Sequence, residues 1–452
     1  MSTSVTLGKR SASSAEKTQC RALGFEQQTL VIRRLIWLYI ILWLIEGGLR
    51  RWVLPGLSTP LLIMRDPLVF VIYCLSVSKG LFPVNGFIIW GTFLALLSFI
   101  NALVLGHGNL FVALYGVRCD FFHVPLIFII AKVLREKDII ALSKVAVWVA
   151  IPYTVLLVAQ FYQPQDAWVN RGVGGDLEGA GFTGALDRYR PPGTFSFISG
   201  PSQLYPLFTA CWFALLLARK LPIWTMIASG GAILITVPIS ISRALFLGVA
   251  IVAMAGVAAM LLRGRFTIKL VIQFALAAIV LSWVAGQSLI FRDGMEAFSA
   301  RWEGATTEQG GFREAIVDRL LNDLFGSFEG INHFGLGTGF STNVGQKLLT
   351  GKPGFGASEA EWGRLLYDNN LLLGSLIIGY RIALVCSIVF ASLRAWHRRS
   401  PASLIFLSAS FLYLLTGQWG QTTTLGSAII GGGLATAASQ HNWEKSKSSH
   451  AP

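Results

Sequence analysis

The sequence predicts an all-α polytopic membrane protein with about twelve transmembrane helices and a large outer loop that contains short amphipathic helices. Of the 452 residues, 54% are hydrophobic and only 13% are charged, which is about half the charged share of a soluble domain. Apolar runs of about 18 residues or more recur along most of the chain, and a run of that length crosses a hydrocarbon core of about 30 Å.

The apolar runs divide the chain into an ordered series of expected spans: 35–50, 61–79, 84–105, 120–135, 139–163, 201–219, 221–241, 243–262, 266–289, 366–393, 401–419 and 424–440. Residues 1–34 are polar, serine-rich and basic, and we expect a disordered cytoplasmic tail there, with a second tail at 441–452. The helices then fall into groups at 35–163, 201–289 and 365–440. A first outer loop at 164–200 and a large outer loop at 290–364 separate these groups.

Basic residues orient the expected bundle. Short connections such as Arg135–Lys137 and Arg219–Lys220 are rich in arginine and lysine, so the positive-inside rule places both termini in the cytoplasm. The formal charge of +14 is then explained by topology, and nucleic-acid binding is a poor interpretation. The five cysteines are scattered without a C-x-x-C spacing, which favours neither a disulfide framework nor a zinc site. We therefore expect no metal and no cofactor.

The large outer loop contains two recognisable stretches. In "GFREAIVDRLLNDLF", Phe312, Ile316, Leu320 and Leu324 recur every four residues, which predicts an amphipathic helix on the bilayer surface or over the bundle. The stretch "GLGTGF" that follows predicts a flexible loop. Because no strand precedes it, it is a weak signal for phosphate binding.

Three arginines are candidates for anion binding. Arg188 and Arg190 lie in the first outer loop, against the topological bias, and Pro-Pro-Gly follows them, which excludes a regular helix. They are either solvated loop residues or ligands. Arg243 is the only ionisable residue between Leu221 and Leu262, and an arginine at the bilayer centre costs roughly 3 kcal/mol. If two helices turn near Pro238–Ser242, Arg243 lies at the outer interface, where it either snorkels or binds a phosphate-bearing lipid.

Four stretches in order resemble the O-antigen ligase and O-antigen polymerase superfamily. They are "RPPGTFSF", "ISISRALFLG", "HFGLGTGF" and "SEAEWGRLLYDNNLLLGSLI", and the resemblance covers roughly residues 185 to 380. It implies a bundle of the membrane-embedded glycosyltransferase type in the bacterial inner membrane. The implied donor is a glycan on undecaprenyl pyrophosphate, the acceptor is a glycan or lipid, and other polysaccharide-assembly proteins are possible partners.

The resemblance also implies roles for particular residues. Arg190, Arg243 and Arg313 match the family's arginines and would bind the pyrophosphate of the donor, and Arg188 is a further candidate beside them. Arginine suits this role because its planar fork forms paired charge-assisted bonds with phosphate. Preorganised cations in a water-poor site stabilise the charge that develops on a leaving pyrophosphate.

The general base for the acceptor hydroxyl stays open. Candidates on the outer side are His333, Glu359 and Glu361, and we take His333 and Glu361 as the catalytic candidates. Ligases of the family tend to carry a histidine where this chain reads "SEAEW". Arg381 lies inside an apolar run and is expected to face the bundle interior, without an assigned role.

We expect a polymerase of lipid-linked O-antigen or exopolysaccharide repeat units. The closest alternative is a ligase that transfers the finished glycan to lipid A core. A lipid or polysaccharide transporter and a noncatalytic scaffold are alternatives from other classes. A transporter predicts charged residues at mid-bilayer on several helices, together with paired broken segments.

Overall fold

The structure is a computed structural model that describes residues 4–177, 183–262, 287–308, 334–352, 354, 358, 360–398 and 400–440. Side chains are described from Glu26 onward, except at 183, 262 and 305–308. It is mostly helical. The α-helices are α1 Ser4–Gly48, α2 Asp66–Ser78, α3 Gly86–Val104, α4 Leu110–Val117, α5 Val124–Val133, α6 Glu136–Tyr162, α7 Ser199–Ala218, α8 Ile223–Ile239, α9 Arg243–Leu262, α11 Leu289–Glu308, α13 Asn343–Thr350, α14 Glu361–His397, α15 Ala402–Leu415 and α16 Thr422–Ser439.

The remaining elements are short. Two π-helices, η1 Leu49–Val53 and η4 Arg118–Phe122, continue α1 and α4, and three 3₁₀ turns are η2 Pro55–Leu57, η3 Pro60–Ile63 and η5 Trp168–Asn170. One antiparallel hairpin joins β1 Thr183–Ala185 to β2 Arg188–Tyr189, with Thr183 opposite Tyr189 and Ala185 opposite Arg188.

The helices confirm the expected all-α class. Among the described residues, seven helical segments are long and apolar enough to cross a membrane, and α8 and α15 are shorter apolar helices. Most of the expected span 266–289 lies outside the described residues, as do 309–333 of the large outer loop with its amphipathic stretch. The number twelve and the form of the outer loop therefore stay predictions.

Several expected boundaries agree with the helices and three differ. The turn between α8 and α9 is Ser240–Ser242, inside the expected Pro238–Ser242 region. In contrast, α14 begins at Glu361 rather than 366, and the expected span 120–135 begins ten residues earlier, at Leu110. Helix α1 begins at Ser4, so the described part of the expected disordered tail is helical.

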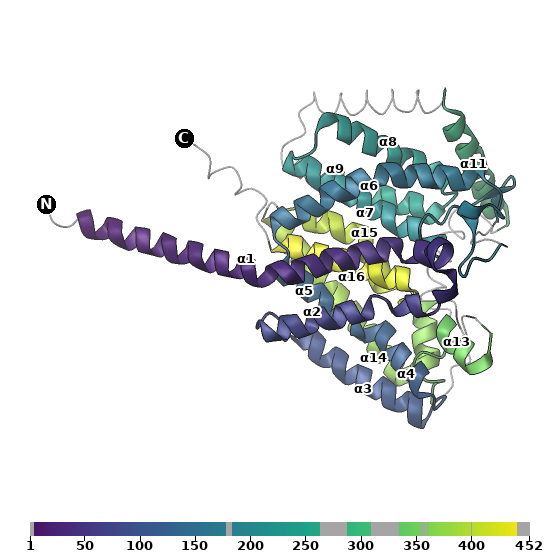
Figure 1. Cartoon of the computed structure of the whole chain (residues 1–452), viewed down its shortest axis with the longest axis horizontal. Helices are drawn as coiled ribbons and strands as arrows, with labels where there is room; N and C mark the ends of the chain where they lie inside the picture. Colours follow the sequence, from purple (N-terminus) through teal and green to yellow (C-terminus); the bar gives the residue numbers. More distant parts are fainter. Residues whose placement is uncertain are drawn as a thin grey trace.

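Helix α16 lies in the middle of the bundle, with α15, α7 and α5 against it (Figure 1). It is buried along nearly its whole length because its residues are small. A Cβ on Gly431 would lie 2.3 Å from the Cβ of Ser410 on α15, and one on Gly433 would lie 2.8 Å from the side chain of Ile130 on α5. Small residues allow such close approach of helices in a membrane, where packing drives association.

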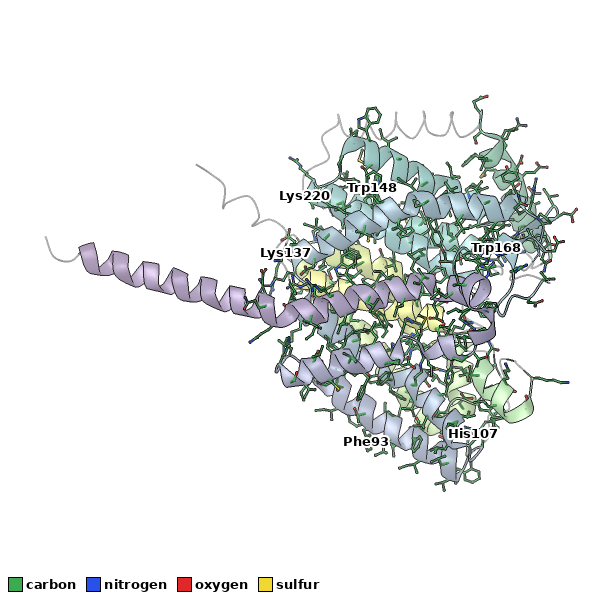
Figure 2. All side chains as sticks on the ribbon, viewed as in Figure 1. Phe93, His107, Lys137, Trp148, Trp168 and Lys220 are labelled. Carbon is green, nitrogen blue, oxygen red and sulfur yellow. The ribbon has the colours of Figure 1, made fainter. Side chains whose placement is uncertain are left out.

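The bundle has two different ends. We call "loop end" the end where the described parts of 49–65, 163–198, 240–242, 334–360 and 416–421 gather. We call "basic end" the end with 79–85, 134–135, 219–222 and the described part of 398–401. Figure 2 shows Trp168 and His107 at the loop end, on the right, and Lys137 and Lys220 at the basic end, on the left. The long connections therefore share one end, as alternating spans require.

Buried charges near the loop end are paired. Asp66 on α2 accepts hydrogen bonds from Arg118 Nε at 2.8 Å and Nη2 at 2.9 Å, and it lies 3.0 Å from His123 Nε2. Tyr39 Oη on α1 lies 3.0 Å from His123 Nδ1, and Arg65 Nη1 donates to the same hydroxyl at 3.2 Å. Charges inside a membrane bundle are tolerated when they pair in this way. We infer that these contacts hold α1, α2 and η4 together.

Candidate functional site

The Pro-Pro-Gly segment at 191–193 is held by hydrogen bonds at Gly193. The Gly193 carbonyl accepts from Arg51 Nη1 at 2.9 Å and from Gln160 Nε2 at 3.0 Å, and the Gly193 amide donates to Gln160 Oε1 at 2.7 Å. Burial lowers the pKa of Arg51 to about 10, so the guanidinium stays charged at neutral pH. The Tyr153 hydroxyl packs against Gly193, whose φ of +64° suits glycine.

Arg190 lies beside the turn that precedes Arg243. A Cβ on Gly184, in strand β1, would lie 2.6 Å from Ile241 Cδ1 and 3.4 Å from Arg190 Cγ. Ile241 belongs to the α8–α9 turn, two residues before Arg243, and has φ +47°. Arg190 and Arg243 are both half-buried. Two arginine-bearing segments that are far apart in the sequence therefore meet at the β-hairpin.

Arg188 on the same hairpin contacts α11. Its guanidinium carbon lies 4.9 Å from the ring centre of Tyr162, and its Nη2 lies 3.8 Å from Asp293 Oδ2. The Tyr162 hydroxyl donates to the same carboxylate at 3.0 Å. Arg188 thus docks α11 onto α6 and the hairpin, and an anion would compete with Asp293 for it.

Helix α14 is broken at Asn370, which has φ +66° and ψ 172°. The Asn370 Oδ1 accepts from the Leu373 amide at 3.0 Å and caps the second part of the helix. A Cβ on Gly374 would lie 2.7 Å from the Leu365 carbonyl oxygen, so the first part bends back toward the second. We call Glu361–Asn369 the short arm of α14. An irregular backbone within an apolar helix is tolerated where protein covers it, and it often marks a functional site.

The stretch "GLGTGF" covers this break. The amides of Leu336 and Gly337 donate to the carbonyls of Tyr367 and Asp368, each at 2.8 Å, so the break leaves neither carbonyl without a donor. Gly335, Gly337 and Gly339 all have positive φ. The loop was expected to be flexible, but it is packed against α14 and the α3–α4 turn.

His107 attaches the α3–α4 turn to the same loop. The Asn109 amide donates to His107 Nδ1 at 2.9 Å, so Nε2 carries the ring proton, and it lies 3.2 Å from the Thr338 carbonyl oxygen. Burial lowers the pKa of His107, which favours this neutral ring. The His107 amide donates to the Leu336 carbonyl at 3.1 Å.

The short arm carries a buried ionic cluster, which we define as Asp120, Glu361, Arg364, Asp368 and Arg381. Arg364 donates to Glu361 through Nε at 2.8 Å and Nη2 at 2.9 Å, and to Asp120 on η4. Its Nη1 lies 3.5 Å from Asp368 Oδ2. Each of the five residues is at most 4% exposed.

Arg381 closes the ionic cluster from the second part of α14. Its Nη1 donates to Glu361 Oε1 at 2.6 Å, and its Nη2 donates to the Gly417 carbonyl at 2.8 Å. The guanidinium carbon lies 3.9 Å from the ring centre of Trp419. Arg381, which was expected to face the bundle interior without an assigned role, thus joins Glu361 to the connection between α15 and α16.

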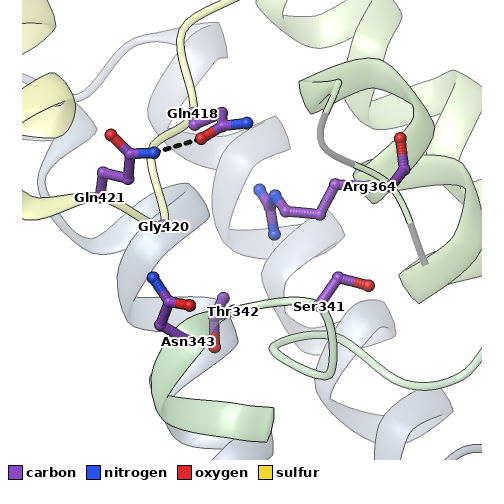
Figure 3. A pocket seen from close by; sticks show the side chains of 8 residues that line it. Ser341, Thr342, Asn343, Arg364, Gln418, Gly420 and Gln421 are labelled. Carbon is purple, nitrogen blue, oxygen red and sulfur yellow. Dashed lines mark hydrogen bonds between the residues drawn. The ribbon is translucent and has the colours of Figure 1, made fainter. Parts of the chain in front are cut away.

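A small polar pocket reaches the ionic cluster. Eight residues line it: Ser341, Thr342, Asn343, Ser358, Arg364, Gln418, Gly420 and Gln421. Figure 3 shows the Arg364 guanidinium pointing into the space between the Gln418–Gln421 segment and the Ser341–Asn343 segment. Among the described residues, only Arg364 contributes a charged side chain to the wall.

The structure thus locates some of the expected site residues. Arg190 meets the turn before Arg243, Arg188 is occupied by Asp293, and Glu361 lies in the ionic cluster rather than beside Arg190. Arg313, His333 and Glu359 lie outside the described residues. The described residues contain no group of three or more metal-ligating side chains.

Sequence reasoning missed Asp120, Arg364 and Asp368. One signal was available, because Glu361, Arg364 and Asp368 fall three and four residues apart in "EWGRLLYD" and so share a helix face. Nothing in the sequence indicated Asp120 as their partner.

Two groups of residues at the loop end are candidates for function: the hairpin arginines with the α8–α9 turn, and the ionic cluster with its polar pocket. No protein-family model, no curated protein and no solved structure matches the chain. Function is therefore inferred from the geometry of these two groups and from the sequence resemblance.

Proposed function

We propose that the chain is a membrane glycosyltransferase that polymerises undecaprenyl-pyrophosphate-linked repeat units of O-antigen or exopolysaccharide. In this proposal the loop end faces the periplasm, and both termini are cytoplasmic. The observation that carries the proposal is the meeting of Arg190 with the α8–α9 turn, since it brings two arginine-bearing segments together at one end of an apolar bundle.

The proposed reaction needs a cationic site. The acceptor hydroxyl oxygen forms a bond to the anomeric carbon of the donor while the bond from that carbon to the pyrophosphate oxygen breaks. The pyrophosphate leaves with the electron pair, and the hydroxyl proton passes to a base. Arg190 and Arg243, with Arg313, would bind the pyrophosphate and stabilise its growing charge.

The contacts of Glu361 favour a positioning role in this proposal. Arg364, Arg381 and the Trp419 amide, at 3.4 Å from Oε1, all donate to its carboxylate. A carboxylate that holds two buried arginines is poorly placed to take a proton. We therefore keep His333 as the proposed general base and assign Glu361 to the orientation of the short arm.

Reconstitution tests this proposal. The purified chain in lipid vesicles is incubated with an undecaprenyl-pyrophosphate-linked oligosaccharide, and both glycan length and released carrier are measured. A polymerase yields longer glycans with one carrier released per bond formed. Transfer only to added lipid A core would instead identify a ligase. No turnover with either acceptor would reject a glycosyltransferase.

A transporter for lipid-linked glycans is the second candidate, and two observations favour it. Helix α14 is broken at Asn370, and the segment Leu110–Val133 is interrupted by the π-helix η4. The ionic cluster connects these two interrupted segments. A transporter would move labelled lipid-linked oligosaccharide across vesicle membranes without changing glycan length, so the same vesicles distinguish the two functions.

A further inference from the structure

We propose that the polar pocket binds the hydroxyl edge of an uncharged sugar and disfavours acidic sugars. This inference deepens the proposed function, on which it rests, by giving the acceptor glycan a subsite and a charge preference. The observations that carry it are the chemistry of the pocket wall, two buried polar atoms without a hydrogen-bond partner, and the charge of the ionic cluster behind the wall.

The pocket wall can both donate and accept hydrogen bonds. Hydroxyls come from Ser341, Thr342 and Ser358, and amides come from Asn343, Gln418 and Gln421. A sugar hydroxyl donates and accepts at once, so a wall of hydroxyls and amides suits it. The wall carries few apolar side chains, which disfavours a lipid chain as the occupant.

Two buried atoms at this pocket have unused hydrogen-bonding capacity. Ser341 is 2% exposed and its Oγ has no hydrogen-bond partner, and Arg364 is 4% exposed and its Nη1 makes no hydrogen bond. Buried polar atoms are nearly always satisfied in native proteins, by protein, water or ligand. In our proposal, hydroxyl groups of the sugar supply these partners.

The charge behind the wall selects against anions. The ionic cluster contains the carboxylates of Asp120, Glu361 and Asp368 and the guanidinium groups of Arg364 and Arg381, so each guanidinium group has at least one carboxylate beside it. All three carboxylates lie within 3.5 Å of Arg364. They compensate the positive charge of its guanidinium group, which would otherwise attract an anion. Arg364 is therefore available as a hydrogen-bond donor to a neutral oxygen.

The size of the pocket limits what enters. Its volume is about 20 Å³, which is room for about one water-sized group. One hydroxyl or hydroxymethyl group would enter, while the sugar ring stays outside the pocket.

Binding measurements on the full chain in lipid nanodiscs test the inference. Saturation-transfer difference NMR is recorded with methyl glucoside, methyl galactoside, methyl mannoside, N-acetylglucosamine and glucuronate. At least one neutral sugar should bind, and glucuronate should bind about tenfold more weakly. Ser341→Ala and Asn343→Ala should each lower the affinity for the neutral sugar by about fivefold, as expected for one lost hydrogen bond.

Matched controls lie at exposed positions outside the pocket wall. Ser299→Ala on α11 and Gln163→Ala should leave sugar binding unchanged. The melting temperature of each variant, measured in the same nanodiscs, checks its folding. The Ser341 amide donates to Asp368 Oδ1 at 3.1 Å, and alanine at this position keeps that hydrogen bond.

Three results would overturn the inference: no neutral sugar binds, glucuronate binds as tightly as the neutral sugars, or the pocket variants bind like the wild type. The first result would mean that the pocket holds only water. Glycan transfer in vesicles is scored separately. Transfer without sugar binding at the pocket rejects this inference alone, and sugar binding without transfer rejects the proposed function.

Discussion

Replacing Arg364 by methionine is expected to destabilise the loop end strongly. Arg364 is the ion-pair partner of Asp120, at Nη2, and of Asp368, at 3.5 Å from Nη1. Among the described residues neither carboxylate has a second ion pair, whereas Glu361 keeps Arg381. The variant therefore leaves two buried carboxylates without a compensating charge.

The size of the loss in the free energy of unfolding follows from these contacts. Removing one partner of a buried ion pair costs about 3–5 kcal/mol, because the remaining charge stays buried and unpaired. Asp120 loses a direct ion pair and Asp368 loses a longer one at 3.5 Å, so the loss should fall within that range. The free energy of unfolding of a typical domain is about 5–15 kcal/mol, so the change is a large fraction of the total.

Equilibrium unfolding in mixed micelles measures the effect, with circular dichroism and tryptophan fluorescence as probes. Arg34→Met, at an exposed position on α1, is the matched control and should change the free energy of unfolding by no more than about 0.5 kcal/mol. Adding Asp120→Asn and Asp368→Asn to Arg364→Met should restore much of the loss. If Arg364→Met behaves like the control, the ionic cluster does not stabilise the short arm.

Two further predictions concern the loops. As pH falls below the ordinary His pKa of about 6.5 toward the lowered pKa of His107, undocking of 334–340 should become easier, because only the released ring binds a proton readily. The protection factor of the Leu336 amide, which is the intrinsic exchange rate divided by the observed rate, should fall over that interval. His107→Gln should remove this fall, and a protection factor that does not change with pH in the wild type would contradict the assignment. Gly193→Ala should lower the melting temperature and abolish function, since the new Cβ would lie 2.2 Å from the Tyr153 hydroxyl at φ +64°. Gly56→Ala, with open space around it, is the control, and equal effects of the two variants would contradict the reasoning.

The sequence predicted the parts of the fold that depend on local signals. Apolar runs bounded by basic residues predicted most helix positions, and Pro238 with a single arginine predicted the turn before Arg243. The α8–α9 turn lies where expected because a charge inside an apolar run has to be brought to a membrane surface or a protein interior.

The ionic cluster could not be predicted because it depends on distant partners. Glu361 and Arg364 are charged, so hydropathy began the expected helix only after them, at 366, and Asp368 fell in its first turn. They are helical and buried because Asp120 and Arg381 compensate their charges. The glycine loop was misinterpreted for the same reason, since its fixed conformation comes from hydrogen bonds to Tyr367 and Asp368.

The central claim is that arginines from separate segments form one pyrophosphate site at the loop end. Binding of undecaprenyl pyrophosphate without a glycan, measured by native mass spectrometry, tests it most directly. Arg190→Ala and Arg243→Ala should each weaken binding at least tenfold, the double variant should lose less than the product of the two, and Arg34→Ala should have no effect. Unchanged binding in Arg190→Ala and Arg243→Ala would contradict the account.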